Sequence, residues 1–157
     1  MESSNQESER YTELSRHFIE KADEYLLAGD TVQASEKAWG AVAEAFKSIA
    51  EERGWSHKGH RLLNDVAFQL SSEWDRRDVK LLFDAIEKLH INFYEDAMEL
   101  DDVAASIVDA KRLLSELEAL RTQSAQPFVV TTREQRNRWR RLTGELRPIQ
   151  APAEQGD

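Results

Sequence analysis

The stretch AGDTVQASEKAWGAVAEAFKSIAEERG, residues 28–54, decides the fold class of this chain. Gly29 can end a preceding helix, because glycine adopts the left-handed backbone conformation without strain. Asp30 can cap the next helix, and Gln33 stands three residues later in the capping-box position. This short turn predicts that the two flanking helices form an antiparallel hairpin, with the second helix over residues 31–53.

The second helix of this hairpin has an unusually wide apolar arc. Small alanines alternate with large aromatic and branched side chains, which is typical of a helix that packs closely on more than one side. The side chains of the arc are Ala34, Ala38, Trp39, Ala41, Val42, Ala45, Phe46, Ile49 and Ala50. We therefore expect residues 31–53 to form the central helix of the fold.

Apolar residues at helical spacing predict further helices on both sides of the central one. The predicted helices cover residues 7–28, 59–74, a segment that starts near 79, and 102–121. Thr132 and Gln135 form another capping-box pattern, which starts a separate basic helix over residues 132–147. The sequence thus predicts an all-α, up-and-down helical bundle over residues 7–121, followed by a linker at 122–131 and the appended C-terminal helix. The ends, 1–6 and 148–157, are expected to be disordered.

Composition agrees with a helical protein and excludes several kinds of site. The 157 residues include only six glycines and three prolines, so few positions break a helix. The chain has no cysteine, which excludes disulfides, thiolate zinc sites and cysteine nucleophiles. No apolar run is long enough to span a bilayer, and the polar N-terminus is unlike a signal peptide, so we expect a cytoplasmic protein without membrane contact. The net charge of −9 argues against general binding of duplex nucleic acid.

The segment LHINFYED, residues 89–96, combines a histidine, an asparagine and a tyrosine on the fourth predicted helix. His90 and Tyr94 are four residues apart and can therefore meet on one face of the helix. Asn92 projects from the other side, so His90 and Asn92 do not form a pair. His90 is either a histidine at the edge of the core with a hydrogen-bonding neighbour, or a residue that contacts a ligand in a groove.

The apolar arc of the fourth helix extends over more than half of its circumference. Its core stripe is predicted to be Leu82, Ile86, Leu89 and Phe93. A second apolar face, with Ile91, Tyr94 and Met98, would then need to be buried against another surface. In a small protein that cover is most simply a second copy of the chain, so these three residues are the candidate interface of a homodimer.

Two further histidines, His57 and His60, flank the predicted turn before the third helix. They could face one metal ion, but neither has an acidic partner at helical spacing, so a role in helix initiation or loop packing is the simpler interpretation. With His90 and Tyr94 they make up the candidate ligand groove. The sequence contains no glycine-rich phosphate loop, no GxSxG motif and no HExxH motif, so it predicts neither a metal site nor a cofactor.

The basic segment after the bundle is the other candidate binding site. It contains six candidate residues: Arg133, Arg136, Arg138, Trp139, Arg140 and Arg141. Arginines around an aromatic ring can hold single-stranded nucleic acid by charge and stacking. They can equally dock on the acidic body, within one chain or between chains, or remain a solvated appendage.

Several segments together resemble the HEPN superfamily, and most closely its archaeal-type PaREP family. YLLAGDTVQASEKAWGAVAEAFKSIAEERG resembles the first helical hairpin of that family, and SHKGH resembles the histidine-containing linker after it. LHINFYEDAMELDDV and DAKRLL are similar to the next pair of helices. The resemblance covers about residues 18–121 and implies an all-α, up-and-down bundle that commonly dimerises.

The resemblance also implies two possible functions. Catalytic members of the superfamily are metal-independent ribonucleases that use an arginine, a polar residue directly after it and a histidine further on. This chain has His90 where the arginine is expected, and no histidine follows it. We therefore expect a non-catalytic binding or scaffold protein, dimeric in the manner of the family, that engages RNA, a nucleotide or a protein partner. The alternative is a ribonuclease in a toxin or defence system, using His90 with Tyr94, or His57 with His60.

Overall fold

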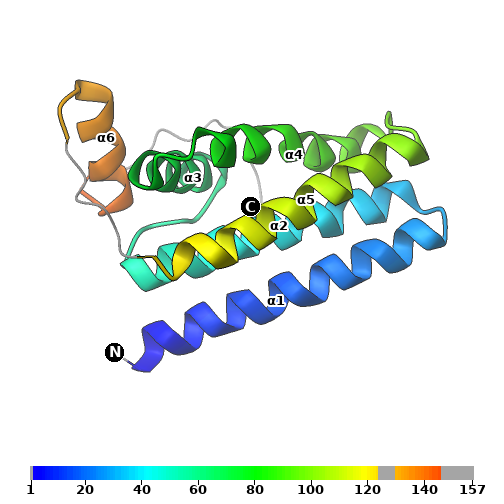
Figure 1. The fold of residues 1–157 in the computed structure, drawn as a ribbon, viewed down its shortest axis with the longest axis horizontal. Helices are drawn as coiled ribbons and strands as arrows, with labels where there is room; N and C mark the ends of the chain where they lie inside the picture. Colours follow the sequence, from blue (N-terminus) through cyan, green and yellow to red (C-terminus); the bar gives the residue numbers. More distant parts are fainter. Residues whose placement is uncertain (1, 124–129, 146–157) are drawn as a thin grey trace.

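The computed structural model describes residues 2–123 and 130–145, and within these ranges it is built from helices without any strand (Figure 1). The elements are α1 (Glu2–Leu27), α2 (Thr31–Arg53), α3 (His60–Trp74), α4 (Arg77–Glu95), α5 (Leu100–Arg121) and α6 (Arg133–Leu142). Figure 1 shows α1 alongside α2, α5 passing in front of α2, which it contacts, and α6 beside α3 at one end of the bundle. The predicted all-α bundle with an additional helix is confirmed.

Helix boundaries differ from the predicted ones mainly at the two ends of the chain. α1 begins at Glu2, whereas residues 1–6 were expected to be disordered. The segment has no glycine or proline, and the buried Ser8 anchors it, since the Ser8 hydroxyl donates to the carbonyl of Ser48 in α2 at 3.0 Å. α6 ends at Leu142 rather than at residue 147, and Gly144 follows with φ of 85°. The predicted disordered tail, 148–157, lies outside the described residues.

The helical hairpin forms around the predicted turn. Gly29 has φ of 77°, and the side chain of Asp30 accepts a hydrogen bond from the amide of Gln33 at 3.0 Å. Further along the pair, Gly40 of α2 lets α1 approach closely, because a Cβ atom there would lie only 3.1 Å from the ring of Phe18. The hairpin is therefore held by backbone geometry at its turn and by small side chains along its length.

α2 is the central helix, as predicted, and it packs against α1, α3, α4 and α5. Its alanines are fully buried at Ala34, Ala38 and Ala41. The rings of Phe46 in α2 and Phe83 in α4 meet edge to face, with centroids 5.2 Å apart, and both are fully buried.

The inward face of α4 is rotated relative to the predicted stripe. Ile86 and Leu89 are buried as expected, but Val79 and Phe83 are also fully buried, whereas Leu82 and Phe93 are only partly buried. The rotation places Asn92, which is 2% exposed, on the face that turns towards the core. Apolar periodicity could not find this arrangement, because a polar residue completes the inward face.

Asn92 joins the end of α4 both to α2 and to the following loop. Its amide nitrogen donates to the hydroxyl of Ser35 at 2.9 Å. Its amide oxygen accepts from the backbone amides of Ala97 and Met98, at 2.7 and 2.8 Å. Asp96 follows the helix with φ of 48°, so the chain turns sharply there. This one side chain therefore satisfies the polar groups of the turn that leads into α5.

Replacing Asn92 with alanine should destabilise the bundle by about 2–4 kcal/mol, because it removes three hydrogen bonds of a buried side chain, one to Ser35 and two from the partly buried amides of Ala97 and Met98. Chemical denaturation followed by circular dichroism measures this change. Glu95→Ala, at an exposed position on the same helix, is the control and should change stability by no more than about 0.5 kcal/mol. A loss below about 1 kcal/mol for Asn92→Ala would show that the turn does not depend on this side chain.

Candidate functional site

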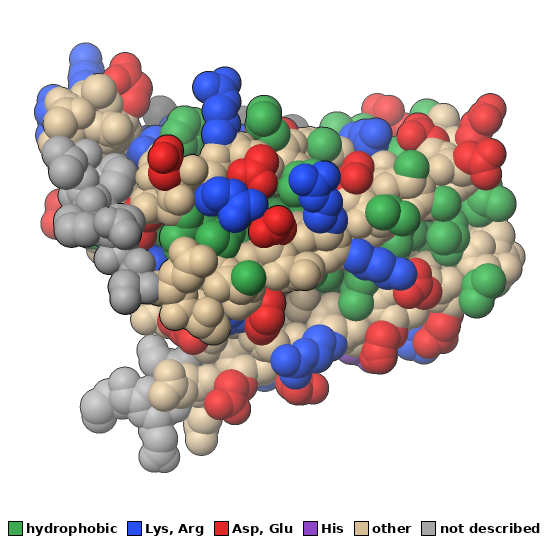
Figure 2. All heavy atoms as spheres, viewed as in Figure 1, with side chains coloured by type: hydrophobic (Ala, Val, Ile, Leu, Met, Phe, Trp, Pro, Cys, Tyr) green, Lys and Arg blue, Asp and Glu red, His purple; other side chains and the backbone are tan. Residues whose placement is uncertain are grey.

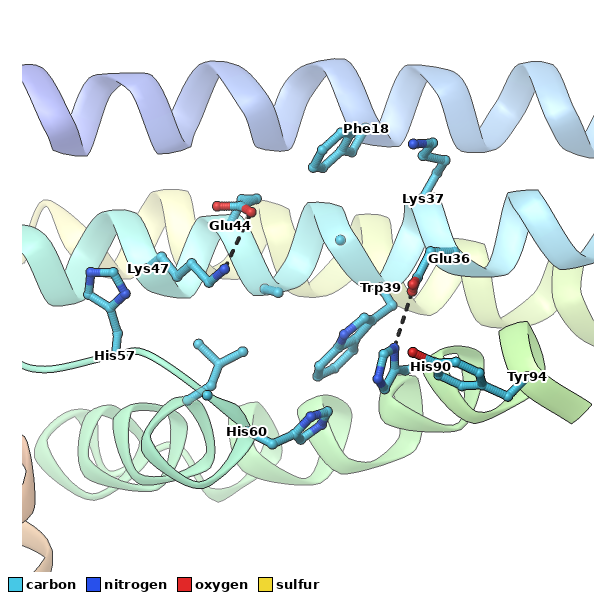
Figure 3. Close-up of a pocket in the computed structure, with 14 residues that line it drawn as sticks. Phe18, Glu36, Lys37, Trp39, Glu44, Lys47, His57, His60, His90 and Tyr94 are labelled. Atoms are coloured by element: carbon cyan, nitrogen blue, oxygen red, sulfur yellow. Dashed lines mark hydrogen bonds and ion pairs between the residues drawn. The ribbon is translucent and has the colours of Figure 1, made fainter. Parts of the chain in front are cut away.

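A groove of about 270 Å³ lies between α1, α2, the start of α3, α4 and the linker that joins α2 to α3 (Figure 3). The four predicted groove residues, His57, His60, His90 and Tyr94, all line it, although three different segments carry them. The structure thus brings together side chains that lie up to 37 positions apart in the sequence. The remaining lining includes Phe18, Glu36, Lys37, Trp39, Gly40, Ala43, Glu44, Lys47, Gly59 and Leu63.

His90 lies at the edge of the core and lines the groove at the same time. Its Nδ1 atom is 3.2 Å from a carboxylate oxygen of Glu36, and its ring centroid is 5.6 Å from that of Trp39. Tyr94 meets His90 edge to face at 5.5 Å, and 72% of the tyrosine is exposed. The two alternatives that the sequence left open for His90 are therefore compatible. Asn92 bonds a different residue of α2, so His90 and Asn92 act separately.

His60 packs directly on the aromatic side chain at the base of the groove. Its ring stacks on Trp39 with centroids 5.4 Å apart and an interplanar angle of 5°. The rings of His60 and His90 have centroids 5.1 Å apart. The Nε2 atom of His60 lies 2.9 Å from a carboxylate oxygen of Glu87 in α4. Trp39 thus fixes the positions of two imidazoles that project from different helices.

His57 occupies the other end of the groove. Its Nε2 atom lies 2.9 Å from a carboxylate oxygen of Glu51, and its ring meets Tyr11 edge to face at 5.4 Å. Its Nδ1 atom is buried and has no hydrogen-bond partner in the described part of the chain. His57 and His60 thus have separate carboxylate partners. Within the described ranges, no three metal-ligating side chains come together.

Charged groups of both signs border the groove. Lys37 lies over the ring of Phe18, 5.1 Å from its centroid, and Lys47 lies 3.5 Å from Glu44. Burial raises the pKa of the nearby Tyr11 phenol, and the carboxylates of Glu44 and Glu51 raise it further. Tyr11 therefore stays uncharged at neutral pH. The lysines and the histidines are the groups in this groove that can face an anionic ligand.

Sequence reasoning missed the part of the groove that α2 contributes. It assigned Trp39 to the core, where the residue is indeed buried, but the same ring supports both His60 and His90. A signal was present in the isolated Gly40 of a long helix, since such a glycine usually marks a close contact or a functional position. Charged residues at helical spacing on either side of it, Glu36 and Lys47, mark the same face.

The candidate dimer interface is only partly continuous in the structure. Ile91 and Tyr94 are 51% and 72% exposed on α4. α4 ends at Glu95, so Met98 does not continue this face, and its side chain packs against the core instead. Figure 2 shows further apolar side chains at the end of the bundle that holds the α1–α2 turn and the start of α5. Leu27 and Leu100 are exposed at that end, and Val108 is exposed further along α5.

The basic helix α6 divides its arginines between the body and solvent. Arg141 makes two hydrogen bonds to Asp65 of α3, at 2.7 and 3.0 Å, and the Asp65 carboxylate is almost fully buried. Arg138 donates to Gln69 at 3.1 Å and lies 4.3 Å from the ring centroid of Phe68. The exposed arginines are Arg133, Arg136 and Arg140.

The buried side of α6 also makes apolar contacts with the other helices and the linker between α2 and α3. Leu142 is fully buried in the hydrophobic core. Trp139 meets Trp55 edge to face at 6.0 Å. Burial lowers the pKa of the Arg138 guanidinium, and Arg141 acts in the same direction while Asp65 opposes it. Among the alternatives that the sequence left open for these arginines, α6 docks on the helical bundle of its own chain.

None of the helices in the described ranges has an apolar stretch of the length needed to cross a bilayer.

Comparisons with known proteins place the bundle in a family. A search of curated proteins and a search of solved structures gave no match. The model of the archaeal PaREP1/PaREP8 family matches residues 10–114, from α1 to α5, which leaves α6 outside the matched region. The chain therefore belongs to the archaeal PaREP1/PaREP8 family.

Proposed function

We propose that this protein is a non-catalytic binding module whose groove holds a nucleotide unit, either free or within single-stranded RNA. The observation that carries the proposal is the convergence of His57, His60, His90 and Tyr94 on one groove. An aromatic base and an anionic phosphate are the two features that define a nucleotide. The groove offers a chemical counterpart for each of them.

The exposed ring of Tyr94 at one end of the groove suits stacking with a base. A base stacked on an aromatic side chain contributes about 1–3 kcal/mol, whatever the identity of the base. Lys37 and Lys47 supply cationic groups for a phosphate, and the Nδ1 atom of His57 has no hydrogen-bond partner among the described residues. The volume of about 270 Å³ is close to the lower end of the range for small-molecule sites, roughly 300–1,000 Å³, and suits a single nucleotide unit.

The proposal extends to a HEPN-like fold and to a location in the cytoplasm. The order of the helices and the linker histidines support a HEPN-like fold, and the absence of cysteine suits a reducing cytoplasm. HEPN-like proteins that lack the arginine and histidine of the ribonucleases bind ligands or partners instead. His90 at the position expected for that arginine is the feature that favours binding over catalysis here.

Tyr94→Ala should weaken binding of a fluorescently labelled single-stranded RNA, or of a labelled mononucleotide, by at least about fivefold, since it removes a base-stacking contact. Fluorescence anisotropy at fixed salt measures the affinity. Leu81→Ala is the control, because Leu81 is an exposed side chain of the same helix, 57% accessible, outside the groove. Equal affinities for the wild type and both variants would place any binding elsewhere, and no binding by the wild type would refute the proposal.

The alternative function is a metal-independent ribonuclease, and one observation favours it. The rings of His60 and His90 lie 5.1 Å apart, so one imidazole could act as general base and the other as general acid. Both rings already face carboxylates and pack on Trp39, which suits a supporting role equally well.

Incubation of the purified protein with labelled RNA in EDTA separates the two functions. We expect the RNA to remain intact. The ribonuclease would be established instead if the wild type cleaves the RNA and both His60→Ala and His90→Ala abolish the cleavage. His17→Ala, at an exposed histidine outside the groove, should then retain it. Cleavage that all three variants retain would point to a contaminating nuclease, because neither His60 nor His90 would then be involved.

We also propose that the exposed side of α4 forms a homodimer interface centred on Ile91, with Tyr94 at its edge, where the tyrosine ring still lines the groove. Sedimentation at tens of micromolar should give the mass of a dimer, and Ile91→Glu should shift the protein to a monomer, because a buried charge without a partner opposes association. Val108→Glu on α5, where the side chain is 65% exposed, should leave the dimer intact. A monomeric wild type would exclude this interface.

A further inference from the structure

The linker between α2 and α3 contributes to the groove and also contacts α6. It runs from Gly54 to Gly59, and both glycines have positive φ, 71° and 92°. His57 projects from the linker into the groove (Figure 3). Trp55, two residues earlier, is 7% exposed and meets Trp139 of α6. Trp55, which contacts α6, is therefore close in sequence to His57, which lines the groove.

A backbone hydrogen bond continues this connection. The amide of Ser56, directly before His57, donates to the carbonyl of Leu142 at 2.7 Å. In the described part of the chain, the other backbone hydrogen bonds of the linker stay within α2, the linker and α3, whereas this one reaches α6. The residue directly before His57 is thus bonded to the last residue of α6.

α6 itself depends on its contacts with the body. It has ten residues, fewer than the ~12–15 that an isolated helix needs to be stable in water. Its capping box, with Thr132 and Gln135, stabilises only its first turn. The remaining stabilisation comes from Leu142, from Trp139 and from the pairing of Arg141 with Asp65. Helix formation and docking are therefore one event, and a short terminal helix of this kind opens more easily than the core.

We propose that docking of α6 regulates the groove by fixing the position of His57. When α6 is docked, Trp139 and the Leu142 carbonyl hold Trp55 and Ser56, and His57 lines the groove with its Nε2 atom against Glu51. When α6 leaves, Trp55 loses its contact with Trp139 and keeps the one with Arg53, the Ser56 amide loses the Leu142 carbonyl, and the linker can move on its two glycines. This regulation rests on the proposed nucleotide-binding function, since the groove is the site that it controls.

The position of His57 can be followed without any ligand. NMR spectra of the histidine side chains in the full chain report each ring, and the signal that disappears in His57→Gln identifies His57. Trp139→Ala should shift this signal, while the signal of His17, which is exposed on α1, should stay in place. Arg140→Ala is the control, because Arg140 lies on the exposed side of α6, 3.8 Å from Glu145.

A second variant covers the case in which Trp139→Ala unfolds the protein. Thr132→Ala removes the cap of α6 at a site remote from the linker, and losing such a cap destabilises a helix by about 1 kcal/mol. It should shift the His57 signal in the same direction by a smaller amount. If His57 keeps its signal in a variant whose α6 has lost its helical structure, the proposal is wrong.

Binding of the labelled single-stranded RNA supplies the second readout. Trp139→Ala and Thr132→Ala should weaken it, the former by at least about fivefold, which is the usual lower range for coupling between sites. Arg140→Ala should leave it unchanged. A shifted His57 signal with unchanged affinity would overturn the regulation. A wild type that binds no RNA or nucleotide would refute the proposed function, whereas the His57 signal would still decide whether α6 controls the linker.

Discussion

Close packing of α1 on α2 is the constraint on which the remaining structure depends. Small side chains on α2 let the two helices approach, and at Gly40 the ring of Phe18 occupies the space that a Cβ atom would need. Because α1 covers one side of α2 so closely, the larger side chains of α2 project towards the other helices. Phe46 and Trp39 both reach Phe83 of α4, and Trp39 then meets the two histidines of the groove. The groove is therefore an extension of the core packing.

Buried polar groups determine how the remaining helices attach to this hairpin. Asn92 joins the end of α4 to Ser35 and to the loop before α5. Arg141 joins α6 to the buried Asp65 of α3. Breaking such a buried pair by removing one partner is costly, whereas exposed ion pairs contribute little. These contacts give the outer helices specific positions, because an unsatisfied buried amide or carboxylate would be costly in any other arrangement.

The same arrangement explains how a short C-terminal helix is connected to a groove formed by the bundle. α6 lies outside the region shared with the PaREP1/PaREP8 family, yet it contacts the linker that carries His57. The family region therefore supplies the groove, and the additional helix contacts one of its edges. The acidic character of the chain agrees with this, since α6 places two of its arginines against the body and leaves the others in solvent.

The sequence by itself determined the helices, the hairpin turn at Gly29 and Asp30, and the central place of α2, because these depend on local caps and on apolar periodicity. It also selected His57, His60, His90 and Tyr94, from residue type and from resemblance, without showing how they meet. Only the tertiary structure decided that Asn92 is buried, that Met98 leaves the face of Ile91, and that Trp39 supports the groove histidines. Polar burial and ring contacts depend on partners far away in the chain. A periodic pattern shows which face of a helix is apolar, but it does not show which distant side chain will meet that face.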